Sequence, residues 1–291
     1  AGVPAVIVFF VISGFCIHYP FRNARRLDLL PYLSRRYLRI GVPLVGAILL
    51  SRPFGVNLTL FQNSILWSLL AELVYYTLYP VLRLIRAKVG WKCIVGASFP
   101  LAYLAVALVS PFAKDYSPFG PSLSWLVAAP CWLLGCLLAE KVDSEKDRAV
   151  TTTEIWSWRI AVWGLSSVAS VLRFHTPVGY PWTLNLFALV VFFWLRVEVA
   201  GFRHSRPTRW LEWAGTWSYS VYLIHMIANA AFPRIASPDL GFNLNWLQKM
   251  AFIYLSSYVF YCLFEKPGHF MARLTSRFLA DGPLKKQAPL P

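Results

Sequence analysis

Residues 123–140 read LSWLVAAPCWLLGCLLAE, an apolar run with no charged side chain before Glu140. A helix needs about 20 mostly apolar residues to cross the hydrocarbon core of a bilayer, which is about 30 Å thick. Runs of similar character recur from one end of the chain to the other. The sequence therefore predicts an all-α fold, a polytopic bundle of transmembrane helices.

The composition agrees with this fold class. Hydrophobic residues make up 57% of the chain and charged residues only 14%, which excludes an ordinary soluble domain. No polar linker separates two cores, so residues 1–291 are expected to form one membrane domain. We expect nine spans, near 1–19, 38–51, 63–82, 91–111, 123–140, 159–175, 181–197, 214–233 and 245–264.

The basic residues predict the topology. The formal charge is +15, but Lys and Arg occur in short clusters between apolar runs, which is typical of cytoplasmic membrane loops and not of a nucleic-acid-binding face. With nine spans, one set of alternate loops holds all of the 28 basic residues except Arg52, Lys114, Arg173, Arg234 and Lys249. This predicts an outside amino end and a cytoplasmic tail, residues 268–291, whose last part, 282–291, is expected to be disordered.

The five cysteines form no CxxC pair and lie within or beside apolar runs. A thiol in such a place behaves as a small hydrophobe. We therefore expect no metal site and no obligatory disulfide.

Glu72 lies near the middle of the predicted span 63–82, where an ionisable residue is costly and indicates function. Ser68, Tyr75 or Tyr76, and Tyr79 recur with it at spacings of three and four, so one helical face carries a carboxylate between hydroxyls. Such a face should look into a protein cavity. A structural hydrogen-bond anchor between helices is the alternative.

His225 lies near mid-depth in the predicted span 214–233. Ser218, Tyr222 and Asn229 share its helical face and form a polar stripe. A histidine can take and return a proton near neutral pH, although a packing role is as common for a lone membrane histidine. Glu72 and His225 are the candidate catalytic residues, with Ser68, Tyr76, Ser218 and Tyr222 lining a shared cavity.

Arg36 and Arg39 lie three residues apart where a helix is predicted to enter the membrane from the cytoplasm. Guanidinium groups at that spacing could clamp a phosphate or pyrophosphate. From the spacing alone, ordinary positive-inside charge or contact with anionic lipid is favoured. In Phe9-Phe-Val-Ile-Ser-Gly-Phe15, the small Ser13 and Gly14 favour close helix packing.

Taken in order, these segments resemble the acyltransferase 3 family of integral membrane acyltransferases. Phe9 to Phe15 is similar to that family's FFxxSGF signature, and residues 32–39 are similar to its YxxRRxxRI stretch. The run WSLLAELVYYTLYP at 67–80 resembles its WSLxxExxFYLxxP span. Near the end, SYSVYLIH at 218–225 and FEKP at 264–267 are similar to its SYSxYLxH and xEKP segments.

The resemblance implies an O-acyltransferase that moves an acyl group, commonly acetyl, from acyl-CoA as co-substrate. The acceptor would be a hydroxyl of a glycan, a lipid-linked sugar or a small metabolite, with no permanently bound cofactor. It assigns Arg36 and Arg39 to the CoA phosphates, and it places Glu72 and His225 at motif positions without fixing their chemistry. The expected partners are membrane lipid, acyl-CoA and the acceptor, in a bacterial inner membrane.

One family feature is missing from the sequence. Members usually carry Arg-x10-His in a first span, with the histidine taken as catalytic, and no Arg here precedes a His at that distance. The chain begins inside a span without Met, so we expect that the first of ten spans is missing. The chain would then be inactive unless His225 is the base, since His18, His175, His204 and His269 are predicted at or beyond span ends.

A membrane transporter or channel for a small polar solute is the alternative function. Glu72 and the polar stripe of 214–233 would then line a pathway. The sequence shows no internal repeat of the kind that transporters often carry, which favours the enzyme.

Overall fold

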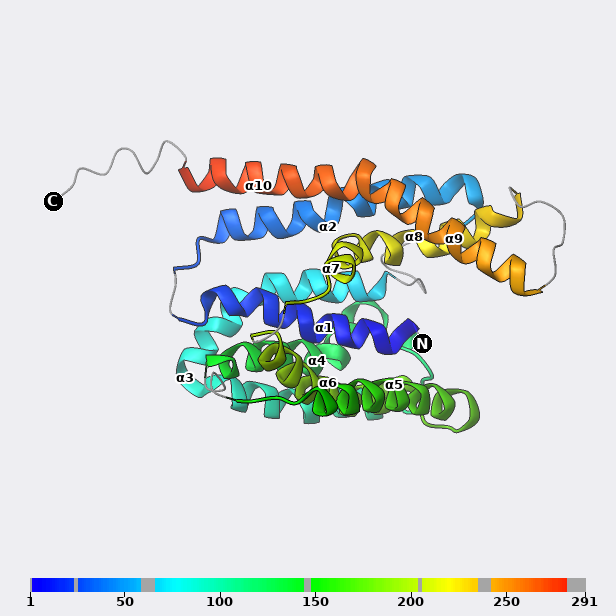
Figure 1. Ribbon diagram of the computed structural model, residues 1–291. Helices are drawn as coiled ribbons and strands as arrows, with labels where there is room; N and C mark the ends of the chain where they lie inside the picture. The colour runs from blue at the N-terminus through cyan, green and yellow to red at the C-terminus, as the bar shows by residue number, and fades with distance from the viewer. Residues whose placement is uncertain are drawn as a thin grey trace. The chain divides into compact units, whose positions relative to one another are not determined.

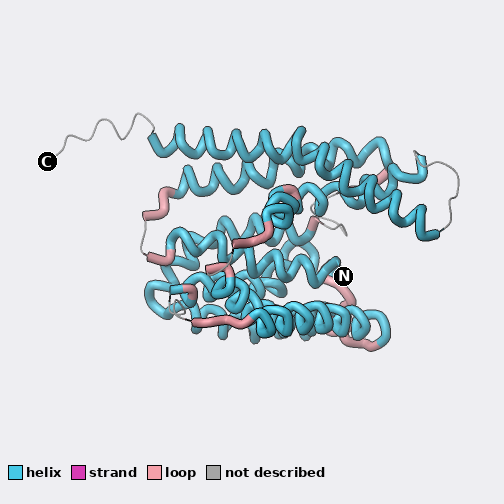
Figure 2. The backbone as a smooth tube through the Cα atoms, viewed as in Figure 1, coloured by secondary structure: helices cyan, strands magenta, loops and turns pink. Residues whose placement is uncertain are grey.

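The computed structural model describes residues 2–23, 26–58, 66–143, 148–203, 206–234 and 242–281. Within these ranges the regular elements are all helical, which confirms the all-α prediction (Figure 2). The helices are α1 (Gly2–His18), α2 (Leu29–Ser51), α3 (Trp67–Val109), α4 (Gly120–Lys141), α5 (Thr152–His175), α6 (Tyr180–Gly201), α7 (Arg209–Thr216), α8 (Ser218–Ala231), α9 (Phe242–Phe260) and α10 (Lys266–Asp281).

Seven helical stretches in the described ranges are long and apolar enough to cross a membrane, against the nine spans predicted. Two differences explain the lower number. The first is a matter of counting: the predicted spans 63–82 and 91–111 correspond to two helices that meet at Gly90, whose φ of 77° and ψ of 158° are not helical, and both belong to the single stretch α3. The predicted span 214–233 is broken at Trp217, and α8 has only 14 residues, fewer than the roughly 20 that a crossing needs.

The chain divides into two compact units, which are described separately. Unit 1 comprises residues 1–27 and 60–206 and contains α1 and α3 to α6; unit 2 comprises residues 28–59 and 207–291 and contains α2 and α7 to α10 (Figure 1). The prediction that residues 1–291 act as one membrane domain stays a prediction.

In unit 1, α1 and α4 cross at two glycines. A Cβ on Gly14 would lie 2.0 Å from the carbonyl oxygen of Trp132, and one on Gly135 would lie 2.0 Å from that of Val11. Real Cβ atoms do not approach oxygen so closely, so both positions require glycine. The packing role predicted for Gly14 is confirmed, and Phe10, Val11 and Ser13 of the same segment are also buried.

The two halves of α3 and one face of α4 line an apolar cleft of about 470 Å³ in unit 1. Tyr75, Leu82 and Ala97 of α3 face it, together with Trp125 and Trp132 of α4. On another side of this unit, α5 and α6 lie side by side (Figure 1). Arg159 of α5 donates to both carboxylate oxygens of Glu198 on α6, at 2.6 and 2.9 Å, and this pair joins the two helices.

In unit 2, α2 and α10 run side by side (Figure 1). A Cβ on Gly46 would lie 2.4 Å from the Phe264 ring, and one on Gly268 would lie 3.2 Å from Cβ of Val42. Position 46 therefore faces position 264 while position 42 faces position 268, which makes the two helices antiparallel. The second short helix of this unit, α8, packs on α9.

A single π-helical turn, Tyr261–Glu265, joins α9 to α10 without a break. Such turns are rare and often lie at functional sites. Residues 268–281, predicted as the start of the tail, continue this helix as α10. The remainder of the predicted tail, 282–291, lies outside the described residues.

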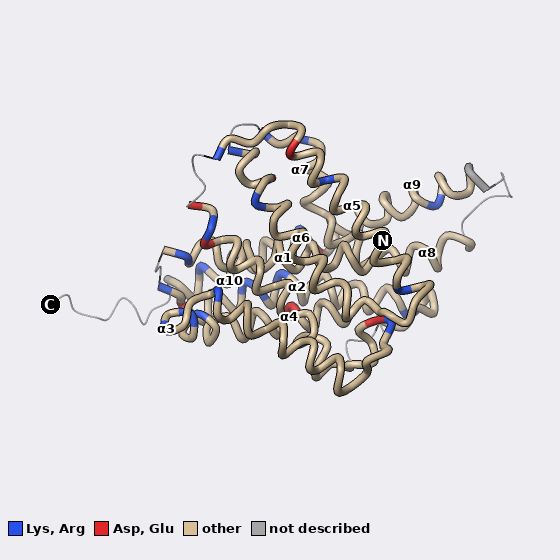
Figure 3. The backbone as a smooth tube through the Cα atoms, turned by 90° about the horizontal axis from the view of Figure 1, so that it is seen from below, with Lys and Arg blue, Asp and Glu red and all other residues tan. Residues whose placement is uncertain are grey.

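The charged positions follow the helix ends in both units. Figure 3 shows that most of the length of the helices carries neither Lys and Arg nor Asp and Glu. Within the described ranges the buried carboxylates are Glu72, Glu198 and Glu265, and a group of this kind must be paired, hydrated or used.

Candidate functional site

Glu72 is buried in unit 1, with 2% of its surface exposed. Its Oε1 accepts a hydrogen bond from Ser13 Oγ of α1 at 2.9 Å and another from Tyr76 OH of its own helix. Trp132 Nε1 of α4 donates to Ser13 Oγ at 3.3 Å. The carboxylate thus joins a hydrogen-bonded network over α1, α3 and α4, which offsets the cost of its burial.

The helical face predicted around Glu72 is buried in full. Ser68, Tyr75, Tyr76 and Tyr79 are all buried, so the face lies against protein. Tyr75 OH donates to the carbonyl oxygen of Trp125 at 2.6 Å and its ring lines the apolar cleft, which Glu72 does not line. The predicted cavity-lining role of Ser68 and Tyr76 stays a prediction.

His18 belongs to a second buried network in unit 1. Its ring is completely buried at the end of α1, with Nδ1 2.9 Å from Tyr79 OH and Nε2 2.6 Å from Oε1 of Glu140. Arg86 contacts the same carboxylate oxygen at 2.6 Å. His18 ends its helix as predicted, and side chains of α3 and α4 enclose it.

The loop after α1 is attached to the end of α4. Arg22 Nε donates to Oδ2 of Asp143 at 2.9 Å. This hydrogen bond is the largest cause that raises the pKa of the Arg22 guanidinium.

His225 lies on α8 in unit 2 and is half-buried. Its Nδ1 lies 2.7 Å from the carbonyl oxygen of Tyr222, and since a carbonyl only accepts, Nδ1 carries the proton. This tautomer leaves the lone pair on Nε2, which is the arrangement that a general base needs.

The polar stripe predicted around His225 lies on the more open side of α8. Ser218 is exposed and donates to the carbonyl oxygen of Gly215 at 3.0 Å, and Tyr222 is half-buried. The buried side holds Ser220 with Leu223 and Ile227. Since Glu72 is in unit 1 and His225 is in unit 2, the common cavity predicted for them stays a prediction.

A carboxylate in unit 2 is as deeply buried as Glu72. Glu265, at the end of the π turn, is 2% exposed and accepts hydrogen bonds from the Ser220 N–H at 3.1 Å and from Ser220 Oγ at 2.5 Å. His269 Nε2 lies 3.6 Å from Oε1 of the same carboxylate. These contacts bring together the two segments SYSVYLIH and FEKP, which are far apart in sequence. His269 lies on α10, five residues beyond the predicted span 245–264, and its predicted place beyond a span end stays a prediction.

Arg36 and Arg39 lie in the first half of α2, also in unit 2. Arg36 is half-buried and Arg39 is exposed. Arg39 lies close enough to Glu265 and His269 to act electrostatically on both. Arg39 therefore borders the point where the last two motif segments meet.

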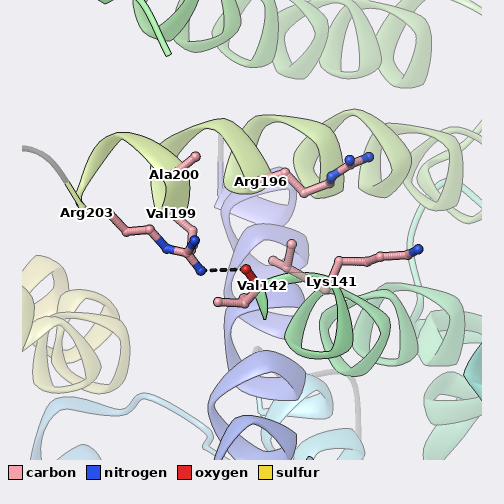
Figure 4. A pocket seen from close by; sticks show the side chains of 7 residues that line it. Lys141, Val142, Arg196, Val199, Ala200 and Arg203 are labelled. Carbon is pink, nitrogen blue, oxygen red and sulfur yellow. Dashed lines mark hydrogen bonds between the residues drawn. The ribbon is translucent and has the colours of Figure 1, made fainter. Parts of the chain in front are cut away.

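A second basic site lies in unit 1, where α4 ends beside α6. Lys141, Arg196 and Arg203 surround a pocket of about 10 Å³, room for about one water molecule (Figure 4). Arg203 donates to the carbonyl oxygen of Val142, which is left without a helical donor at the end of α4 (Figure 4). Arg203 therefore has a structural role, and the pocket is too small for a phosphate ester.

The seven long apolar helical stretches indicate an integral membrane protein, and Glu72, His18 and Glu265 are ionisable side chains buried among its helices. The model of the Acyl_transf_3 family, described as an acyltransferase domain, matches residues 1–265. The chain therefore belongs to this family of membrane acyltransferases, which confirms the resemblance seen in its motifs. It is 25% identical over 288 residues to Acyltransferase MdmB of Streptomyces mycarofaciens, an alignment that covers 84% of this chain and 73% of that protein. No solved structure matches the chain.

The residues that sequence reasoning missed are the partners of the predicted ones. Ser13 was assigned to packing, but it also donates to Glu72. Glu265 was quoted only as part of a motif, one residue beyond a predicted span, although a carboxylate at that place is itself a signal. His18 and Glu140 were both predicted at cytoplasmic span ends. Because this places them at the same depth in the membrane, a contact between them could have been predicted. Within the described ranges, no three His, Cys, Asp or Glu side chains are placed to hold a metal ion.

Proposed function

We propose that this protein transfers an acetyl group from acetyl-CoA to a hydroxyl of a glycan, a lipid-linked sugar or a small metabolite. The observation that carries the proposal is the tautomer of His225, because Nδ1–H bound to the Tyr222 carbonyl leaves Nε2 as a base. The family supplies the reaction class, acyl transfer. Unit 2 supplies both a base and, on α2, a pair of guanidinium groups suited to the phosphates of CoA.

The reaction needs a base that gives its proton back. Nε2 of His225 takes the proton of the acceptor hydroxyl while the oxygen attacks the thioester carbonyl of acetyl-CoA. The carbon–sulfur bond breaks, the imidazolium protonates the departing thiolate, and an O-acetyl ester and free CoA are the products. The imidazole is then neutral again and ready for the next acceptor.

Glu72 has a supporting role in this proposal. Its carboxylate would orient the acceptor hydroxyl or the imidazole, with Ser68 and Tyr76 beside it and Ser218 and Tyr222 lining the same cavity from α8. This requires the sites of the two units to open into a common cavity. The hydrogen bonds from Ser13 and Tyr76 support this role, because they fix the position of the Glu72 carboxylate.

The test is the transfer of labelled acetyl groups from CoA in membranes that contain the full chain. Labelled acetyl-CoA should acetylate material in a glycan, lipid or small-molecule fraction, and mild alkali should release the label because O-acetyl esters are base-labile. The His225→Ala variant should transfer no label above membranes without the protein. Flux of a polar solute that needs no CoA, with no label transferred, would support the transporter instead.

The proposed orientation places the carboxyl end, the tail from residue 268 and the donor site on the cytoplasmic side of a bacterial inner membrane. It is supported by the distribution of Lys and Arg in alternate loops. Topology reporters fused after Pro118 and Pro207 should report opposite sides. Reporters on the same side would contradict this orientation without affecting the chemistry.

A further inference from the structure

Five guanidinium groups gather on α2 and α10 in unit 2. Arg35 lies within electrostatic range of Arg36, Arg39, Arg273 and Arg277, of which the last two are on α10. We propose that these five groups form one binding site for the polyphosphate part of the acyl donor, to which α10 contributes two groups beside the three on α2, where the sequence motif lies. The inference rests on the proposed function, whose donor is acyl-CoA.

The packing of the two helices brings the five residues together. Position 46 of α2 faces position 264, and position 42 faces position 268. Continued toward the amino end of α2, this antiparallel register brings Arg273 level with the turn that holds Arg36 and Arg39. Arg277 lies one turn further, level with the turn just before Arg35. Both helices therefore present guanidinium groups at the same end of the pair.

This arrangement is electrostatically unfavourable without an anion. Like charges three or four residues apart on a helix destabilise it, and both Arg36 with Arg39 and Arg273 with Arg277 have that spacing. Glu265 is a carboxylate near Arg39, but it already accepts two hydrogen bonds from Ser220. Arg35, Arg39, Arg273 and Arg277 are exposed, so a polyanion can reach them and would relieve the repulsion among them.

The number of charges favours CoA over a membrane lipid. CoA carries a phosphate monoester and a diphosphate, together about four negative charges near neutral pH. A phospholipid with one phosphodiester carries a single phosphate charge, so it would leave most of the cluster uncompensated. Arg36 and Arg39 alone would in turn leave half of the CoA charge unmatched, and planar guanidinium groups suit phosphate oxygens in pairs.

The test is direct CoA binding to the full chain in nanodiscs, which needs no acceptor and no turnover. The dissociation constant for CoA is measured by calorimetry for the wild type, Arg273→Ala/Arg277→Ala and Arg36→Ala/Arg39→Ala. The matched control is Arg52→Ala/Arg209→Ala, which removes two exposed cations from the same unit. All four are measured in neutral phosphatidylcholine and again with anionic phosphatidylglycerol added.

In neutral nanodiscs, Arg273→Ala/Arg277→Ala should weaken CoA binding by at least about tenfold, because charge-assisted hydrogen bonds to phosphate are lost, and the control by less than about twofold. Equal losses in these two variants, or no loss in either, would overturn the inference. A loss that appears only with phosphatidylglycerol would also overturn it and assign Arg273 and Arg277 to lipid phosphate. If the wild type binds no CoA at all, the donor of the proposed function fails as well.

Discussion

Unit 1 and unit 2 both hold ionisable groups inside apolar helices, but they use them differently. In unit 1 the groups are enclosed by partners of opposite or complementary character: Glu72 by Ser13 and Tyr76, and His18 by Tyr79 and Glu140. In unit 2 guanidinium groups lie beside one another, and His225 keeps a lone pair on Nε2.

This difference separates stability from function. A buried group with its hydrogen bonds made holds helices together, and removing it leaves its partners unsatisfied. A cluster of like charges or a half-buried histidine adds little to folding, and in the proposed function both contact the substrates. Unit 2 also contains one enclosed carboxylate, Glu265 with Ser220, so the contrast holds for particular residues and not for every group of a unit.

The largest effect is expected for His225→Ala, which should lower the rate of acyl transfer by about 100-fold to 10,000-fold through loss of the general base. Thermal unfolding should change little, because the ring is half-buried and its hydrogen bond is to its own helix. His175→Ala, which removes an exposed histidine from α5, is the matched control. A comparable loss of rate in the control would show that His225 is not special.

Variants of Glu72 test the comparison in unit 1, where the loss of a buried, hydrogen-bonded group should lower the stability. Glu72→Ala should destabilise unit 1 by about 1–3 kcal/mol, measured by unfolding in detergent, because Ser13 Oγ and Tyr76 OH lose their shared acceptor and, at 3.4 Å from each other, only one of them can then donate to the other. Glu72→Gln keeps an acceptor, so it should retain most of the stability.

The proposed catalytic role predicts that Glu72→Gln still loses acyl transfer by about tenfold or more, because the charge is gone. If this variant is fully active, Glu72 is only an anchor between α1 and α3. Ser13→Ala, which removes one donor to the carboxylate, is the companion variant and should cost stability without changing the charge.

A smaller effect is expected for His18→Ala, which should lower the stability by about 1–3 kcal/mol because Tyr79 OH and the Glu140 carboxylate lose a buried partner. The rate of acyl transfer per folded molecule should be unchanged. A variant that folds normally but transfers no acyl groups would break the comparison and place His18 in the chemistry.

The fold class was predictable because hydrophobic length dominates the energetics of a membrane chain. The number of spans was less so, because the predicted span 214–233 is broken at Trp217, just after Gly215 at the end of α7. The helices on the two sides of Gly90 do correspond to the predicted spans 63–82 and 91–111. The family could be recognised from local motifs, because these keep their order and residue types.

The partners in the candidate site were harder to predict. Glu72 and His225 stand out as polar residues in apolar runs, whereas the contact between Ser13 and Glu72 depends on how α1 approaches α3. The same holds for Arg273, which looks like ordinary tail charge until Gly46 and Gly268 fix the register of α10 against α2. Long-range pairing of this kind follows from packing and leaves no periodic signal in one sequence.

The π turn at Tyr261–Glu265 has a consequence for how α9 and α10 are aligned. A π turn accommodates one residue more than an α turn, which shifts the angular position of everything after it by about 100°. The face of α9 that packs on α8 is therefore not the sequence continuation of the face of α10 that packs on α2. Deleting one residue from this turn would keep the helix continuous and all five guanidinium groups in the chain, yet it would rotate Arg273 and Arg277 away from α2, so their angular placement depends on one inserted residue.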